Sequence, residues 1–299
     1  METFLIFIVF ILGTIVGSFI NVLVDRTDTE RSPFLGRSFC PYCGKTLSWW
    51  EMVPVINYFY LRGSCSSCHH KLPLQYPLIE FLTGLLFALA SWRFLRFPLI
   101  SPSSVFGGNL ETFLLWLMFF FWLYWIFVLV AISLYDLKKY LILNEVLFPA
   151  LILTLSWKVV LGFVLLKHNL PLVSQTLRFL GPQSYVFGNY SYFVSLILGP
   201  VVSGGLIALL AYLTQERAMG WGDAWVALFL GLILGWPESL MALMIAFLVG
   251  GVVALILIIF NKKTLKSYLP FAPFLACGAL SILLFGDIII EKYLTLFLL

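Results

Sequence analysis

The chain has 299 residues, of which 62% are hydrophobic and only 11% are charged. This balance excludes an ordinary soluble domain and indicates a polytopic membrane protein embedded in a lipid bilayer. The net charge of +4 is modest. Because the basic residues lie in short loops beside apolar runs, no nucleic-acid partner is expected.

The first apolar run covers about residues 4–24 and is long enough to span a bilayer. Arg26 and Arg31 follow this run, whereas no basic residue precedes it. Since basic residues favour the cytoplasmic side, the N-terminus is predicted to lie outside. A cleaved signal peptide is the less favoured alternative, because a basic n-region and a small-residue cleavage site are missing.

A polar segment, 25–76, follows and is predicted to be a small cytoplasmic insert. Seven further apolar runs come after it, at about 77–94, 110–135, 141–166, 190–213, 224–236, 240–260 and 271–290. We therefore predict an all-α fold with about eight transmembrane helices. Its parts are a first transmembrane helix (1–24), the insert (25–76) and a membrane-embedded domain (77–299). The sixth span is short, and it is expected either to tilt or to continue towards Pro237 and Glu238.

If the eight spans cross the membrane in alternating directions, starting from an N-terminus outside, four loops lie in the cytoplasm. These loops hold twelve of the 18 Lys and Arg residues and cover 25–76, 136–140, 214–223 and 261–270. This bias agrees with the predicted orientation. Asp136 and Asp223 are thus both expected to face the cytoplasm. The longest outer loop, about 167–189, is predicted to be irregular.

Two Cys-x-x-Cys pairs lie in the insert, separated by 21 residues, and comprise Cys40, Cys43, Cys65 and Cys68. Four thiolates in two tight turns form the tetrahedral sulfur site that structural zinc prefers. The alternative is two disulfides or unpaired thiols, although a reducing cytoplasm disfavours disulfides. His69 or His70 could also replace one thiolate. A structural metal would help to fold a segment too small to form its own core.

Gly220-Trp221-Gly222-Asp223 forms a short break between long apolar runs. An acid at a membrane boundary is costly to desolvate and is a candidate functional group. Gly220 and Gly222 lack a Cβ atom, so a protein or substrate backbone can approach the carboxylate closely. If Asp223 begins the next helix, the positive end of that helix favours its ionised form.

Asp136 follows the third apolar run and is the second acid that peptide hydrolysis by acid–base chemistry requires. Two carboxylates at one site share a proton, so one can activate water while the other polarises the peptide carbonyl. The alternative is two unrelated acids that are solvated or paired with Lys138 or Arg217. Glu80, at the start of the second span, is predicted to pair with a basic group or to face the active-site cavity.

Several blocks of this sequence resemble bacterial type IV prepilin peptidases, in the family's order and across nearly the whole chain. The first half contributes Gly17-Ser-Phe-Ile-Asn-Val22, Cys40-Pro-Tyr-Cys43-Gly, Leu61-Arg-Gly-Ser-Cys65-Ser-Ser-Cys68 and Gln75-Tyr-Pro-Leu-Ile-Glu80. The second half contributes Asp136 with Ile142 and Asn144, then Met219-Gly-Trp-Gly-Asp223 and Leu269-Pro-Phe-Ala-Pro-Phe-Leu275.

The resemblance implies a membrane aspartyl protease of the Gly-x-Gly-Asp type, located in the bacterial inner membrane. That family removes the leader from type IV prepilins and type II secretion pseudopilins, on the cytoplasmic side of the substrate helix. Many members then methylate the new N-terminus using S-adenosylmethionine. By motif position, the resemblance assigns Asp136 and Asp223 as the catalytic pair and the four cysteines as the metal ligands.

Two positions depart from the family's pattern. Leu143 stands where members usually have Pro, and Trp225 stands where they often have Lys. Neither change removes a carboxylate, but both bear on substrate fit and local charge. Two other functions are weighed against this one. A different intramembrane aspartyl protease would not need the cysteine insert, and a transporter or scaffold would use the acids for protons or ions.

Overall fold

The computed structural model describes residues 2–27, 32, 36–95, 110–167, 191–217, 219–262, 264 and 267–297. The predicted outer loop lies outside the described residues, apart from Lys167. The described chain forms helices and contains only isolated β-bridges in place of strands. The predicted all-α fold is therefore confirmed. Two compact units are present, and each is described separately below.

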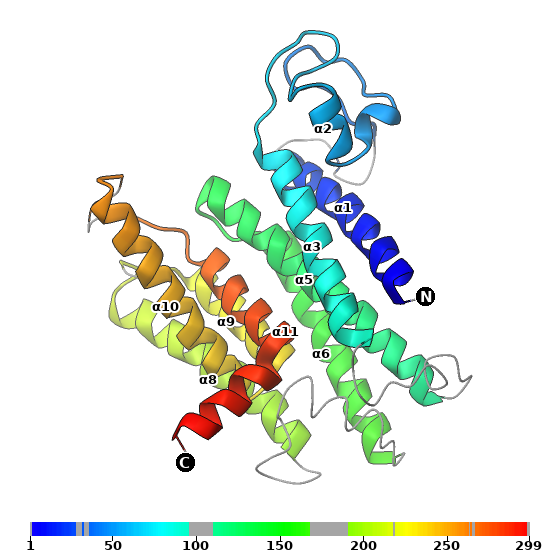
Figure 1. Ribbon diagram of the computed structural model, residues 1–299. Coiled ribbons are helices and arrows are strands. Elements are labelled where there is room, and N and C mark those ends of the chain that lie inside the picture. Colours follow the sequence, from blue (N-terminus) through cyan, green and yellow to red (C-terminus); the bar gives the residue numbers. More distant parts are fainter. Residues whose placement is uncertain are drawn as a thin grey trace. The chain divides into compact units, whose positions relative to one another are not determined.

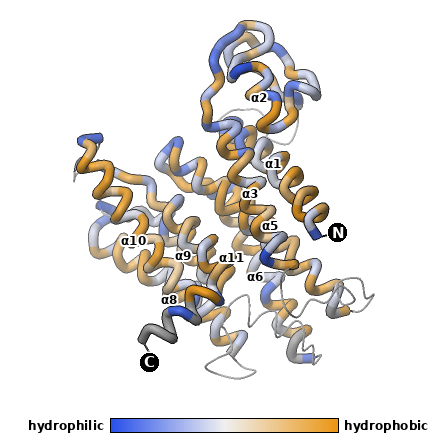
Figure 2. Tube along the Cα trace, in the orientation of Figure 1, coloured by the Kyte–Doolittle hydropathy of each residue, from blue (hydrophilic) through white to orange (hydrophobic). Residues whose placement is uncertain are grey.

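Seven of the described helices are long and apolar enough to cross a membrane, and an eighth apolar helix is shorter. The long helices are α1 (Glu2–Arg26), α3 (Gln75–Leu95), α5 (Leu110–Lys139), α6 (Asn144–Lys167), α8 (Ser191–Leu213), α10 (Glu238–Ile259) and α11 (Ala272–Phe297). Figure 2 shows that they are mainly hydrophobic, whereas the segment between α1 and α3 is mixed.

The shorter helix is α9 (Trp221–Leu234), which corresponds to the predicted sixth span. At 1.5 Å per residue, 14 residues reach about 21 Å, less than the roughly 30 Å hydrocarbon core. The expected continuation towards Pro237 and Glu238 is wrong. Gly235, at φ 82°, ends the helix, and α10 begins anew at Glu238.

The first unit contains α1, α3, the insert and the middle of α5, at 119–131. Helices α1 and α3 lie side by side (Figure 1). Their backbones approach so closely that a Cβ atom on Gly17 would lie 2.7 Å from the Cα atom of Glu80. Small residues at such contacts let membrane helices pack without a hydrophobic driving force between them. The Gly-Ser-Phe-Ile-Asn-Val block thus fixes α1 against the Glu80 segment.

The insert between α1 and α3 holds a 3-10 turn, η1 (Trp50–Met52), and a short helix, α2 (Ile56–Tyr60). Two isolated bridges, Phe39 to Thr46 and Ser64 to Lys71, close its two cysteine turns. Glu51 ties these parts together, because its carboxylate accepts hydrogen bonds from the Lys45 ammonium, the Ser48 N–H and the Ser66 hydroxyl. Those donors hold the pKa of Glu51 down at about 2, with the Ser66 contact contributing most.

The second unit contains both ends of α5, at 110–118 and 132–139, together with α6 and α8–α11. Helices α8 and α9 pack tightly, since a Cβ atom on Gly231 would lie 2.4 Å from the Pro200 backbone. The buried Ser203 hydroxyl also donates to the Ala227 carbonyl across this contact, at 2.8 Å. These contacts hold the N-terminal turn of α9, which carries Asp223, in a fixed position.

Two buried ionisable side chains, Lys158 and Glu238, lie within the same unit. Lys158 on α6 donates to the carbonyl oxygen of Ile233 at 3.0 Å, and the charge of Glu238 at the start of α10 acts on it. Glu238 is fully buried, and neither carboxylate oxygen has a hydrogen-bond partner in the described part of the chain. Lys158 therefore links α6 to α9 through the Ile233 carbonyl, and its positive charge partly compensates the nearby buried Glu238.

Candidate active site and metal centre

Asp136 lies in the last turn of α5 and is 5% exposed. The sequence placed it just after the span, but the helix continues to Lys139, since Tyr140 N–H still donates to the Asp136 carbonyl. Its Oδ2 atom accepts a hydrogen bond from the backbone N–H of Ala272, at 3.0 Å. Ala272 is the first residue of α11, where backbone N–H groups have no partner inside the helix. Asp136 therefore caps a helix that begins far away in the sequence.

Asp223 lies in the first turn of α9, as its expected position at a helix start predicted. Its Oδ2 atom accepts the backbone N–H of Gly220 at 3.3 Å, and Gly220 is the extended residue that precedes the helix. Both acids thus lie at the positive end of a helix, which stabilises the negative charge of a carboxylate.

Both acids belong to the second unit, where the charge of Asp223 acts on the Asp136 carboxyl group. Gly222 brings the first turn of α9 against the turn after α5, because a Cβ atom there would lie 2.5 Å from Cγ1 of Ile142. A Cβ atom on Gly220, by contrast, would meet nothing closer than 3.9 Å. Gly222 is therefore required for packing, whereas the space beside Gly220 stays open.

The two departures from the family's pattern lie near these elements. Leu143 is 2% exposed, and its carbonyl accepts the N–H groups of Val146 and Leu147 at the start of α6. Trp225 is partly exposed on α9 and makes an edge-to-face contact with Phe148 on α6, with ring centroids 5.5 Å apart. Both residues thus contribute to the packing at the start of α6, where the side chain of Trp225 lies against an aromatic ring.

The four predicted cysteine ligands come together as one cluster, and all their sulfur atoms lie within 4.8 Å of one another. The cluster comprises Cys40, Cys43, Cys65 and Cys68. Two cross-pair Sγ distances are 3.9 and 4.0 Å. A tetrahedral ion with Zn–S bonds of about 2.3 Å requires sulfur separations of roughly 3.8 Å, so these four residues could hold a metal ion.

The backbone of the two cysteine turns repeats the same geometry. The N–H groups of Gly44 and His69 donate to the carbonyls of Cys40 and Cys65, at 2.9 and 3.0 Å. Both Gly44 and His69 have positive φ angles, 70° and 56°. All the cysteines are free thiols, so the alternative of two disulfides is not what this structure contains. The His70 ring stacks on Tyr42 at 3.4 Å, which leaves ligation to the thiols.

Glu80 belongs to the first unit and is 8% exposed. Its Oε2 atom accepts the backbone N–H of Val55 in the insert at 2.7 Å, and Ser18 on α1 also binds it. The predicted partner was a basic group, but the observed partners are a backbone amide and a hydroxyl. Glu80 therefore links α3 to the insert and to α1, and it lines a cavity between them.

Sequence reasoning missed the role of Ala272 and of two residues beside Glu80, Asn21 and Tyr76. The Asn21 side-chain amide donates to the Tyr76 carbonyl at 3.2 Å, which connects α1 to the first turn of α3. All three residues fall inside blocks that carried the family resemblance. That resemblance was the available signal, although it gave none of these contacts.

Comparison with known proteins identifies two matching family models. Residues 11–94 match the bacterial peptidase A24 N-terminal domain, and residues 121–255 match the type IV leader peptidase family. The chain is also similar to the prepilin leader peptidase/N-methyltransferase of Bacillus subtilis, with 27% identity over 96% of this chain and 97% of that protein. The protein of the same name from Aeromonas hydrophila is 27% identical over 97% and 94% of the two chains.

A shorter match reaches higher identity. The protein of this name from Myxococcus xanthus is 44% identical over 85 residues, which is 28% of this chain and 25% of that protein. No solved structure matches the chain.

Proposed function

Because this chain belongs to the type IV leader peptidase family and is a multi-pass inner-membrane peptidase, we propose that it removes leader peptides from type IV prepilins or type II secretion pseudopilins. The proposed catalytic residues are Asp136 and Asp223. The observation that carries this assignment is that two acids 87 positions apart in one compact unit each accept a backbone N–H at a helix start, Asp223 from Gly220 before α9 and Asp136 from Ala272 of α11.

The proposed mechanism is general acid–base hydrolysis. Two carboxylates in one site hold one proton between them and titrate as a pair. The ionised carboxylate takes a proton from water, and the protonated one donates a hydrogen bond to the scissile carbonyl. The Oδ2 atom of Asp223 accepts the Gly220 N–H, and the Oδ2 atom of Asp136 accepts the Ala272 N–H. In both acids, Oδ1 is left for the water or the peptide. The helix starts hold both groups in place before substrate arrives.

The substrate is proposed to be a single apolar helix with a basic leader. Peptide bonds inside a helix are shielded by their own hydrogen bonds, so the segment around the cleavage position must unwind. The open space beside Gly220 would accommodate that unwound backbone next to Asp223. Gly222 does not offer the same space, because Ile142 already occupies it.

The proposed orientation has the N-terminus outside and both acids facing the cytoplasm. The distribution of Lys and Arg supports it, since loops on that side carry most of the basic residues. The insert would then lie in a reducing compartment, where thiols remain available to a metal. We propose that the four cysteines hold a structural Zn²⁺, which would stabilise the insert and take no part in hydrolysis.

We further propose that the enzyme methylates the new N-terminal amine, using S-adenosylmethionine as the donor. The names of the similar proteins support this second activity. When bound, S-adenosylmethionine would supply the methyl group to the neutral amine, and S-adenosylhomocysteine and a proton would be released.

The experiment that tests the proposal is intact-mass analysis of a pilin-type substrate co-expressed with wild-type protein or with Asp223→Asn. The expected result is that the substrate loses its leader with wild-type protein and stays uncut with Asp223→Asn. A mature product heavier by one methyl group would report the second activity in the same spectrum. Cleavage by Asp223→Asn at the wild-type level would overturn the assignment. Cleavage of an ordinary transmembrane peptide in place of the pilin would instead support a different intramembrane aspartyl protease.

A further inference from the structure

The insert exposes a group of large apolar side chains. Trp49 and Trp50, at the start of the 3-10 turn η1, are 60% and 65% exposed, and their rings stack with centroids 3.6 Å apart. In the short helix α2, the exposed fractions of Ile56, Phe59 and Tyr60 are 70%, 68% and 83%. Protein surfaces usually carry such residues singly, so five of them in one small segment indicate an interaction surface. These five residues are called the insert patch below.

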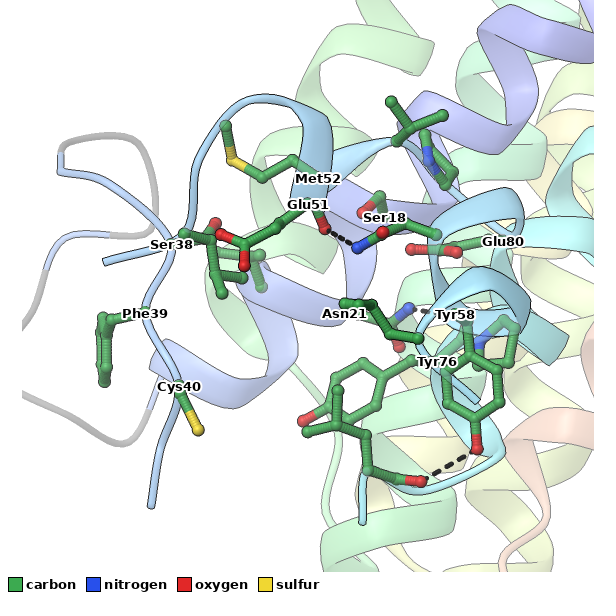
Figure 3. Close-up of a pocket in the computed structure, with 18 of the residues that line it drawn as sticks. Ser18, Asn21, Ser38, Phe39, Cys40, Glu51, Met52, Tyr58, Tyr76 and Glu80 are labelled. Atoms are coloured by element: carbon green, nitrogen blue, oxygen red, sulfur yellow. Dashed lines mark hydrogen bonds between the residues drawn. The ribbon is translucent and has the colours of Figure 1, made fainter. Parts of the chain in front are cut away.

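Helix α2 has an inward polar side and an outward apolar side. Its three patch residues are spaced i, i+3 and i+4, which places them together on one side of a helix. The opposite side carries Asn57 and Tyr58, which line a cavity shared with α1 and α3, as does the following Leu61 (Figure 3). The Asn57 amide donates to the Glu51 carbonyl at 2.6 Å, and the Tyr58 hydroxyl donates to the Leu72 carbonyl at 3.0 Å. These bonds fix the helix with its apolar side outward.

Helix α2 begins beside two helices that are long and apolar enough to cross a membrane, α1 and α3. Val55, which precedes α2, donates its backbone N–H to Glu80 in the second turn of α3, and Ser18 on α1 binds the same carboxylate. From Ser18, α1 continues to Arg26, which is about 12 Å at 1.5 Å per residue. The insert therefore folds back along the ends of both spans, which places the insert patch near the membrane boundary.

Basic side chains lie close to the insert patch in the chain. Arg62 follows α2, and Lys71 forms the bridge that closes the second cysteine turn. Both are exposed, and neither forms a salt bridge with another described residue. Across residues 36–74, four Lys and Arg residues stand against one acid, Glu51, which Lys45 already pairs. This charge complements anionic lipid headgroups, and Trp and Tyr rings favour the zone between headgroups and acyl chains.

We propose that the insert patch docks on the surface of a bilayer that contains anionic phospholipid. The stacked Trp49 and Trp50 rings and the outward side of α2 enter the interfacial zone, while Arg62 and Lys71 contact lipid phosphates. Lipid is the occupant because both ends of the insert continue into membrane-spanning helices, which keep the patch beside the bilayer. A substrate helix or a second copy of this chain would have to displace that lipid. The inference is independent of the proposed catalytic acids, which belong to the second unit.

The test locates the insert patch in the full-length protein, reconstituted in nanodiscs of phosphatidylethanolamine and phosphatidylglycerol. The tryptophans are replaced biosynthetically by fluorotryptophan, and the fluorine resonances of the patch are assigned with Trp49→Phe and Trp50→Phe. Phe59→Trp adds a reporter on α2. Ser67→Trp is the matched control, because it adds the same ring to an exposed position of the second cysteine turn. Metal content and thermal unfolding show that each variant is folded.

Each preparation is measured with a nitroxide near the top of the lipid acyl chain and, separately, with a water-soluble gadolinium chelate. The resonances of Trp49, Trp50 and the Phe59→Trp reporter are expected to lose at least about twice as much intensity to the lipid nitroxide as to the chelate. The Ser67→Trp resonance should show the reverse. Equal or stronger broadening of the patch resonances by the chelate would overturn the proposal. Broadening by neither agent would also overturn it, because protein and not lipid would then cover the patch.

Discussion

Asp136 accepts a hydrogen bond from the backbone N–H of Ala272, and these two residues are 136 positions apart in the chain. The bond joins the last turn of α5 to the first turn of α11. It therefore fixes one proposed catalytic acid by a backbone N–H group, which only a substitution by proline would remove. This relationship makes the start of α11 part of the proposed active site.

Removing that N–H group is expected to lower cleavage while leaving the fold intact. Ala272→Pro lacks the donor but fits the first turn of a helix, where proline is tolerated. A hydrogen bond to a charged group contributes about 1.5–3 kcal/mol, so kcat should fall roughly ten- to 100-fold. Ala272→Gly keeps the N–H and should stay within a few-fold of wild type. Equal activity of the two variants, measured with a purified pilin substrate, would show that the bond has no role.

Gly222 and Gly220 should respond differently to the same substitution. Gly222→Ala forces a Cβ atom against Ile142 and should cost about 1–3 kcal/mol of stability, as overpacking usually does. Gly220→Ala meets no such contact and should unfold close to the wild-type temperature. Adding Ile142→Ala to Gly222→Ala should restore part of the loss, since the two positions are coupled. Thermal unfolding in detergent checks this, and an unchanged midpoint for Gly222→Ala would contradict the packing.

Removing only one of the two buried residues, Lys158 or Glu238, should destabilise the protein. Lys158→Met removes the hydrogen bond to the Ile233 carbonyl and the positive charge near Glu238, and should cost about 1–3 kcal/mol. The double variant Lys158→Met/Glu238→Gln should recover part of that loss, because no buried charge remains. Unfolding midpoints of the two variants measure the difference. A single variant as stable as the double would mean that the two charges do not interact.

Metal removal should act on the insert. The purified protein is expected to contain about one zinc per chain, bound by the four thiols. Cys68→Ser should lose the metal and expose the insert to protease, whereas Cys277→Ser, a free thiol outside the cluster, should change neither property. Elemental analysis and limited proteolysis provide the readouts. If wild-type protein contains no metal and its insert still resists protease, a structural role for zinc is contradicted.

The sequence predicted the apolar helices and the cysteine cluster because both depend on local information. The length of an apolar run indicates a transmembrane span, and the Cys-x-x-Cys spacing indicates a metal-binding turn. Helix ends were less accurate: Asp136 lies inside α5, and α9 ends at Leu234. Charged residues continue a helix past the membrane boundary, and a glycine with positive φ can end one inside an apolar run.

Long-range contacts could not be predicted from the same information. The hydrogen bond from the Ala272 N–H to Asp136 involves a backbone group, and every residue type except proline carries that group, so the sequence does not indicate it. Glu80 was expected to pair with a basic group or to face the active-site cavity, but it binds the Val55 amide, because the insert folds back onto α3. The assignment of Asp136 and Asp223 as catalytic stays a prediction, since proximity alone does not establish chemistry.

The most direct test of the central claim is the cleavage rate of purified Asp136→Asn, Asp223→Asn and the double variant. Groups that act as one catalytic unit are not additive, so each single variant should lose at least about a thousandfold, and the double should be no worse. Glu145→Gln, an exposed acid in the first turn of α6, should cleave normally. A single Asp variant that retains more than about a tenth of wild-type activity would contradict the pair.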